Sequence, residues 1–568
     1  MEYGYNINLR RMAAVAYSAS LWENPGTKLM VSNYFNSYQY GRRKKDAWIK
    51  WNELTLAVIK QIDNKISSTV VAEYVIDVVT MMGFDIFSWA QYMKKLLGPT
   101  FLTNKIYWTS HGAINLQKTI ALILKENHHF VESKSAPVLY LASSCALTDY
   151  MTDACNSVLK WAEKMNGDLS KQSLYGEDMI RYISGVLVSL GHELQLNKKD
   201  EWLQDKNKSK EVKLFLLAVS RGHPAAVNFH WEKMTLTEKS ENLLNAVNQC
   251  VELCWEMYKT PDNLCRVNNF FQVIMFLKLK MPDKERQEVF LESGEKILII
   301  ALSCSSGHEL FIPIFEENKK FLRASDYVCI FKKIASQIFN AFKLKISFDT
   351  NFYHIMLKRF WFKIPQEKKL IMSKDADFLS GVLKRLFKAN DFKNIGVITN
   401  DTCIKGMQIE LLKVGIKYMK KWVFVNNRRA FEKFKNDVFQ SDEERKYFIC
   451  QDDFVLEFLQ DCKVHYVEIL LSWITNSAEE YKKIKKRIFN LEMCGMLFMG
   501  RCFDEMTDYL NWQFDTEYER KSIKHLFKDE MCENIYQSYL KYERRDEVED
   551  VCSQYIRWLC KSDSEIRV

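Results

Sequence analysis

The sequence predicts an all-α protein built largely from stacked pairs of helices. Glycine and proline are scarce, at 19 and 8 among 568 residues, which disfavours a turn-rich β architecture. Apolar residues recur at the 3.6-residue spacing of helices throughout the chain. Apolar anchors followed by polar turns return about every 31 to 47 residues, close to the lengths of helix-pair repeats. Together these observations indicate an α-solenoid.

The length and composition favour an elongated array or several domains over one compact core. A chain of 568 residues exceeds what a single core supports. Apolar residues make up 47% of it and charged residues 27%, both ordinary for a folded protein. The N-terminus lacks the continuous apolar stretch of a signal peptide, and no apolar run is long enough for a membrane helix. We therefore expect a cytoplasmic protein.

Residues 1–130 are expected to form a helical N-terminal region without repeats. The first helix ends at the turn signal Asn24-Pro25-Gly26. Ser110-His111-Gly112 has no acid partner and no nucleophile-elbow pattern, so a turn before a helix is favoured over a catalytic role. The expected helices are Leu9 to Trp22, Trp48 to Ile62, Val70 to Met82, Phe84 to Leu97, and the latter part of Ile106 to Lys125.

The clearest repeat lies at residues 215–234, FLLAVSRGHPAAVNFHWEKM, and we call it the index repeat. Gly222 should end its first helix, because glycine adopts the left-handed conformation without a Cβ clash. Pro224 should open the second helix, where its missing N–H is not needed. Ala218, Val227, Phe229 and Trp231 are expected to be buried together, and Glu232 and Lys233 to be exposed.

The index repeat resembles an ankyrin repeat. Ala218 and Val219 match the two small residues, Gly222-His223 the turn, Val227 the valine and Trp231 the last leucine position, whereas His230 departs from the other leucine. The Thr-Pro-Leu-His opening is absent. The resemblance implies a structural role for His223. With its helical head, the wider pattern also resembles uncharacterised, lineage-expanded invertebrate proteins, and this resemblance implies no activity.

Weaker copies are expected along residues 131–568, which should form a degenerate ankyrin-like helical repeat array. Each copy ends in an apolar anchor and a polar turn rich in Lys and Glu. A second Gly-His turn, Gly307-His308, has Ile312 at the offset that separates Val227 from Gly222. Phe392 to Ile398 resembles a further unit. The anchors are Met165, Leu203, Met234, Met281, Ile364, Phe439, Ile474, Phe514 and a last one near Leu559.

The charges give only a weak signal for nucleic acid. The net charge is +9, and basic and acidic residues alternate along the chain. The basic runs Arg42 to Lys45 and Lys482 to Arg487 could bind nucleic acid or direct nuclear import, but solvated surfaces are favoured. The 15 cysteines show no disulfide framework. Cys250 and Cys254 share a helix face without nearby histidines, so buried, reduced thiols are expected.

The motifs of common enzymes are missing from the sequence. It contains no P-loop, GxGxxG, HExxH, GxSxG or kinase motif set. His128 and His129 are adjacent, which places them on different faces of a helix and disfavours joint metal binding. We therefore predict no catalytic, cofactor-binding or metal-binding residues and no cofactor.

Three functional hypotheses remain, and the third of them is a nucleic-acid-binding solenoid, whose signature would be a steep salt dependence of binding. The first is a non-enzymatic protein–protein interaction scaffold, because stacked helix pairs present a long recognition surface. Its protein partners are unknown, and nucleic acid and membrane insertion are not expected. The alternative is an enzyme of unknown reaction in the aromatic-rich N-terminal region, with the repeats as a targeting arm. A deep polar pocket in that region would favour the alternative.

Overall fold

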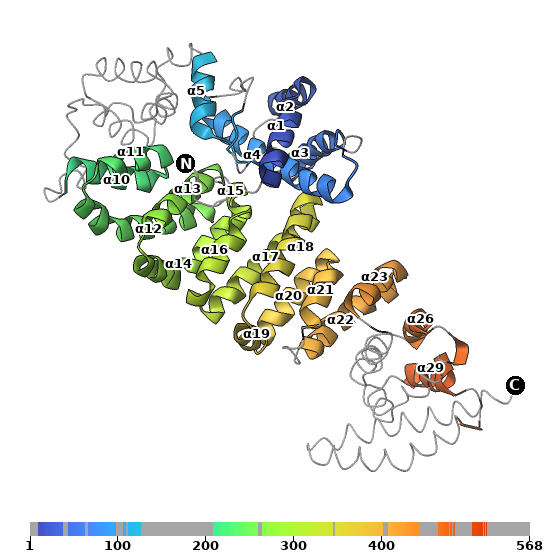
Figure 1. Ribbon diagram of the computed structural model, residues 1–568. Helices are drawn as coiled ribbons and strands as arrows, with labels where there is room; N and C mark the ends of the chain where they lie inside the picture. Colours follow the sequence, from blue (N-terminus) through green and yellow to red (C-terminus); the bar gives the residue numbers. More distant parts are fainter. Residues whose placement is uncertain are drawn as a thin grey trace, which may run out of the picture. The chain divides into compact units, whose positions relative to one another are not determined.

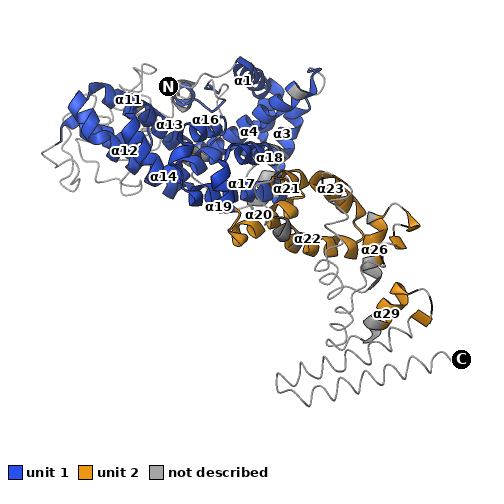
Figure 2. Cartoon of the chain, turned by 60° about the horizontal axis from the view of Figure 1, so that its bottom comes forward, with its two compact units in different colours: residues 1–372 blue, residues 373–568 orange. Residues whose placement is uncertain are grey.

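The chain divides into two compact units, residues 1–372 and 373–568 (Figure 2). In this computed structural model, unit 1 contains both the predicted N-terminal helices and much of the predicted repeat array. The domain boundary expected near residue 130 stays a prediction. The residues that the structure describes are 9–37, 44–62, 66–97, 106–109, 112–126, 208–259, 264–344, 347–401, 407–439, 464–475 and 503–514, with isolated positions at 441, 477–479, 481–482, 485, 516 and 518–519.

The described chain is all-α, as the sequence predicted (Figure 1). Within it, the one β feature is an isolated antiparallel bridge between Trp108 and Ile114. None of the helices in the described ranges is long and apolar enough to cross a membrane. In unit 1 the helices are α1 Leu9–Trp22, α2 Pro25–Ser37, α3 Lys44–Ile59, α4 Thr69–Leu97, α5 Leu116–Glu126, α10 Lys210–Arg221, α11 Pro224–Lys233, α12 Leu236–Tyr258, α13 Leu264–Lys280, α14 Asp283–Ser303, α15 Ser305–His308, α16 Phe311–Asn318, the short 3-10 helix η4 Lys319–Phe321, α17 Ala324–Leu344, α18 Ser347–Lys363 and α19 Gln366–Met372.

The first four helices form an aromatic core around α4. The predicted bounds of α1 are confirmed, but the two helices expected on either side of Gly83 are one continuous helix, α4. The Trp22 and Trp51 rings stack with centroids 6.0 Å apart. Their indole N–H groups donate to the α4 carbonyls of Val79 and Gly83, at 2.9 and 3.1 Å. A Cβ on Gly83 would lie 2.5 Å from the Trp22 ring, so glycine at this position leaves the space that the ring occupies. The helix continues through Gly83 without a break.

Helices α10 to α18 form two layers of stacked helix pairs. Helix α10 packs on α12, α12 on α14, and α14 on α17, which makes one layer. Helices α11, α13 and α15 contact one another in sequence and make the other layer. The pairs α10–α11, α12–α13 and α17–α18 join the layers (Figure 1). Because each pair contacts mainly its neighbours, this part of the chain has the arrangement of an α-solenoid.

The turn of the index repeat has the predicted conformation. Gly222 caps α10 at φ 63°, in the left-handed region, and Pro224 occupies the first turn of α11. The backbone N–H groups of Gly222 and His223 donate to the carbonyls of Val219 and Ala218, both at 3.0 Å. These bonds satisfy carbonyls at the end of α10, which have no partner within the helix.

The buried face of α11 differs from the prediction at two positions. Ala218, Val227 and Trp231 are buried, and Glu232 and Lys233 are exposed, as expected. The prediction for Phe229 is wrong, since its ring is only half-buried and the Lys233 ammonium lies 4.0 Å from its centroid. His230 takes the buried position instead, with its Nδ1 3.1 Å from the Glu211 carboxylate of α10.

Several predicted anchors are buried at the junction between two successive helices. Met234, Met281 and Ile364 each have 6% or less of their surface exposed and directly precede a new helix. Phe439 and Phe514 are only half-buried, and α26 ends at Ile474. Met165, Leu203 and the anchor near Leu559 lie outside the described residues, as do Arg42, Arg43, His111, His128 and His129.

The recurring polar turn proves to be the first turn of the following helix. Thr235 caps α12 through a hydrogen bond from the Glu238 backbone N–H, and the Glu238 carboxylate accepts from the Thr235 N–H at 2.8 Å. Thr516 and Glu519 repeat this pairing. Acidic side chains at these positions oppose the positive end of the helix dipole. The repeated sequence signal therefore marks helix starts.

Gly307 does not form the second left-handed turn that was predicted. It lies inside the short helix α15, and Ile312 is half-buried. A Cβ on Gly307 would sit 2.4 Å from the Ala301 carbonyl oxygen. This glycine is needed because α15 approaches the backbone of α14 closely, and no positive φ is involved.

Three cysteines lie in the core as free thiols, as expected. Cys250, Cys254 and Cys304 are buried. The thiols of Cys250 and Cys254 point from α12 to the α13 carbonyls of Phe270 and Val267, at 3.7 and 3.8 Å. Burial raises the pKa of both thiols. They therefore remain protonated and act as small apolar residues with a weak donor.

Unit 2 repeats the helix-pair pattern. Its helices are α20 Ala376–Ala389, α21 Phe392–Thr399, α22 Met407–Phe424, α23 Arg428–Val438, α26 Val464–Ile474 and α29 Phe503–Gln513. Helices α20, α22, α26 and α29 contact one another in sequence, and α21 packs on α23. The predicted unit at Phe392 to Ile398 is α21. In unit 1 the pair α12–α13 covers Leu236–Lys280, which is longer than the roughly 33 residues of an ankyrin unit.

Candidate functional site

The described part of the chain contains no metal cluster. No group of three or more His, Cys, Asp or Glu side chains in these residues could hold an ion. The sequence predicted no catalytic, cofactor-binding or metal-binding residue to locate. Three features remain for a functional reading: a pocket, an ionic contact and a basic surface.

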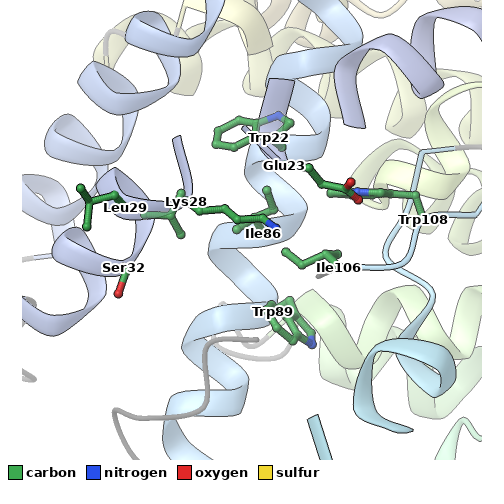
Figure 3. A pocket seen from close by; sticks show the side chains of 10 residues that line it. Trp22, Glu23, Lys28, Leu29, Ser32, Ile86, Trp89, Ile106 and Trp108 are labelled. Atoms are coloured by element: carbon green, nitrogen blue, oxygen red, sulfur yellow. The ribbon is translucent and has the colours of Figure 1, made fainter. Parts of the chain in front are cut away.

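The pocket lies among the N-terminal helices and has a volume of about 280 Å³ (Figure 3). Its walls are mostly apolar, and its charged side chains are Glu23 and Lys28. No histidine, cysteine or aspartate lines it, and its single hydroxyl is that of Ser32. The enzyme alternative gains no support from this pocket. The lining residues are Trp22, Glu23, Lys28, Leu29, Val31, Ser32, Ile86, Trp89, Ile106 and Trp108.

The ionic contact between the buried Arg11 and the exposed Glu309 joins α1 to the repeat helices. The Arg11 side chain is 5% exposed, and its Nη1 lies 3.2 Å from Oε1 of Glu309, which follows α15. Its Nη2 lies 3.3 Å from the Met81 sulfur of α4. Burial lowers the pKa of the adjacent His308 to about 4. Its Nε2 donates to the Leu302 carbonyl at 2.9 Å, so His308 is neutral near pH 7 and positions α15.

Helix α4 covers part of the repeat helices. It packs against α13, α15 and α18, while α3 contacts α17. Phe352 of α18 packs on the core cluster of the N-terminal helices. The N-terminal region therefore occupies one side of the stack between α13 and α18. A partner of unit 1 must use other helix faces unless this region moves.

The ionisation of Asp77 makes the stability of the folded protein depend on pH. Burial raises the pKa of Asp77 to about 7, and the nearby carboxylates of Glu73 and Glu309 add to the rise, whereas Arg11 opposes it. The pKa in the unfolded chain is about 4. The folded state therefore binds this proton more tightly, and the resulting stability is present below about pH 4 and is lost as the pH rises through 7.

Replacing Asp77 with asparagine should therefore stabilise the protein most at alkaline pH. We expect Asp77→Asn to melt at a higher temperature than the wild type at pH 8, because it removes a buried charge. The difference should narrow as the pH falls to 5, where Asp77 is protonated. Asp377→Asn, an exposed carboxyl in the first turn of α20, is the control. If the difference in melting temperature between Asp77→Asn and the wild type did not change with pH, this result would contradict the raised pKa of Asp77.

The basic surface lies on α20 and α22 of unit 2. Residues 373–439 contain 14 Lys and Arg against 7 Asp and Glu, a local excess that the overall +9 conceals. Lys384 and Lys388 on α20 and Lys413, Lys417 and Lys421 on α22 are exposed, and we call these five lysines the basic face. The Tyr418 hydroxyl donates to the Lys384 backbone carbonyl at 3.2 Å, where α22 packs on α20.

The sequence prediction missed the two charged features for different reasons. Arg11 and Glu309 are remote in the sequence, and nothing local links them. The basic face does have a local signal, since Lys413, Lys417 and Lys421 are spaced four residues apart on one helix. A count of charges in a short window would have revealed it.

The comparisons with known proteins do not identify a family. No family model and no curated protein matches the sequence. Among solved structures, the chain is similar to a "Circular tandem repeat protein with novel repeat topology and enhanced subunit contact surfaces", with 11% identity over 98% of this chain and 99% of that one. The TM-score is 0.15, so this similarity carries no argument. The fold class follows from the helices and their contacts.

Proposed function

We propose that the protein is a non-enzymatic scaffold for protein–protein interaction in the cytoplasm. The observation that carries the proposal is the stacking of helix pairs in each unit, which leaves rows of side chains from successive helices on the surface. Unit 2 offers the exposed row with the clearest chemical character, the basic face. The pocket among the N-terminal helices has mostly apolar walls, so it lends no support to the alternative of an enzyme with a targeting arm.

The index repeat supports a proposed ankyrin-like origin for at least part of the stack. Gly222 at positive φ, the following Pro224 and the buried Val227 and Trp231 agree with that resemblance. The longer pair α12–α13 departs from it. We therefore propose ankyrin-like repeats mixed with longer helix pairs, in a chain related to lineage-expanded invertebrate proteins.

Affinity capture followed by chemical cross-linking and mass spectrometry tests the scaffold proposal. We expect the full chain to capture the same protein partners reproducibly, with cross-links on exposed helix faces. A Trp231→Ala chain, in which the index repeat is disrupted, controls for capture by misfolded protein. Turnover of a small molecule by the purified chain, without any protein partner, would refute the proposal.

A further inference from the structure

We propose that the basic face binds an acidic amphipathic helix of a partner protein. The inference rests on the proposed scaffold function and names the chemistry of one partner. Acidic side chains spaced four residues apart would pair with the lysines of α22. An apolar side chain at one end of the partner helix would pack on Phe424 and Val425, which are 70% and 57% exposed.

The spacing of the lysines fits a helical partner. Lys413, Lys417 and Lys421 are four residues apart, so successive positions rise by about 6 Å along α22. A partner helix with Glu or Asp at every fourth residue has the same rise. The Lys384 and Lys388 pair on α20 has this spacing too. Because α20 packs on α22, exposed lysines from both helices could contact one acidic helix.

Three of the five lysines, Lys384, Lys417 and Lys421, are available for such pairing. Lys384, Lys417 and Lys421 have no ion pair or hydrogen bond from their side chains within the described residues. Two carboxylates of adjoining elements are engaged elsewhere: Glu432 of α23 pairs with Lys435 at 2.8 Å, and Asp391 is buried and caps α21. Positive charge on this face is thus not neutralised by these groups, and it would attract an acidic partner.

The apolar end of α22 favours a protein over a single-stranded nucleic acid. Phe424 and Val425 lie three and four residues after Lys421 and expose apolar surface where the row of lysines stops. Grooves for single-stranded nucleic acid usually offer several aromatic rings on which successive bases stack, whereas Phe424 would offer one ring, at the end of the row. The ring of Tyr418, midway along this row, is already stacked on Phe387, with centroids 4.9 Å apart. An acidic helix with an apolar end satisfies both features of the surface.

Fluorescence anisotropy with the full chain and designed peptides tests the inference. The probe is a labelled helical peptide as long as α22, 18 residues, with Glu at every fourth position and Phe and Leu at one end. We expect it to bind the wild type, and the same peptide with Gln in place of Glu to bind poorly. The triple change Lys384→Glu, Lys417→Glu and Lys421→Glu should weaken binding by about tenfold or more, since three surface ion pairs are lost.

Matched variants separate the basic face from general charge. Lys60, Lys284 and Lys358 are exposed lysines of unit 1, and changing all three to Glu alters the net charge equally. That variant should bind the acidic peptide within about twofold of the wild type. A peptide with Lys in place of Glu should bind the triple Glu variant of the basic face. An unchanged helical circular dichroism spectrum and melting temperature would show that this variant is folded.

Three results would overturn the inference. They are the failure of the acidic peptide to bind the wild type, equal weakening by the control variant, and tighter binding of oligouridylate than of the peptide at the same face. Capture experiments distinguish a failure of the basic-face inference from a failure of the proposed scaffold function. If the basic-face variant still captures all wild-type partners, the scaffold stands and the basic face is not its docking surface. If the wild type captures no protein, the scaffold itself fails.

Discussion

Replacing Gly222 with alanine should destabilise the protein by about 2–5 kcal/mol. Alanine would have to adopt φ 63°, a left-handed conformation that costs about 1–2 kcal/mol for an L-residue. Its Cβ would also lie 2.7 Å from the Phe270 ring of α13, which adds roughly 1–3 kcal/mol of overpacking. Phe270 is fully buried, so the ring cannot swing away without disturbing the core.

The region of the chain that Gly222→Ala destabilises is as informative as the change in the free energy of unfolding. Hydrogen exchange on Gly222→Ala should accelerate in α10 to α13, because repeats contact mainly their neighbours. Unit 2 should change little. Gly381→Ala is the control: this glycine lies within α20, its Cβ would meet only the flexible Arg385 side chain, and alanine favours helix. Equal acceleration along the whole chain would argue for one cooperative globule and against a repeat stack.

Replacing Trp231 with alanine should cost about 3–5 kcal/mol, the range for deleting a buried tryptophan. Trp231 is 6% exposed. Its ring lies 5.6 Å from Phe215 of α10 and 6.4 Å from Phe276 of α13, centroid to centroid. The substitution would therefore leave a cavity shared by three helices, and the surrounding side chains could fill it only in part.

Thermal or denaturant unfolding measures this effect. Trp255→Ala is the matched control, because the Trp255 ring on α12 is only half-buried and stacks on Tyr258. The control should lose clearly less stability than Trp231→Ala. An unchanged melting temperature for Trp231→Ala would contradict the placement of this tryptophan in the core.

The local structure of the index repeat was predictable because short-range chemistry decides it. The conformation of Gly222 and the position of Pro224 follow from backbone sterics alone. Phe229 was mispredicted because Val227, Phe229 and Trp231 alternate with the period of a strand. In a helix, residue 229 points about 200° away from residue 227, so one face cannot bury all three. His230 fills the buried position, and Glu211 from the preceding helix satisfies its ring.

The arrangement of the N-terminal helices was not predictable from local patterns. Gly83 is a helix breaker by propensity, yet α4 continues through it, because Trp22 packs where a side chain would stand. The contact between Arg11 and Glu309 joins distant parts of the chain, and a single sequence carries no signal for such a pair. The absence of common catalytic motifs left no site to predict. The basic face was predictable in part, since the lysines of α22 are spaced four residues apart in the sequence, but the packing of α20 on α22 was not.

The packing of α4 on α13, α15 and α18 has a consequence for synthesis on the ribosome. Helix α4 ends at Leu97, but its partner α18 ends at Lys363. At roughly 5–20 residues per second, the intervening chain takes about a quarter of a minute to a minute to emerge. During that interval the apolar side of α4 that later meets α18 lacks this partner. The nascent N-terminal helices are therefore expected to need a chaperone, and chains truncated before α18 to aggregate.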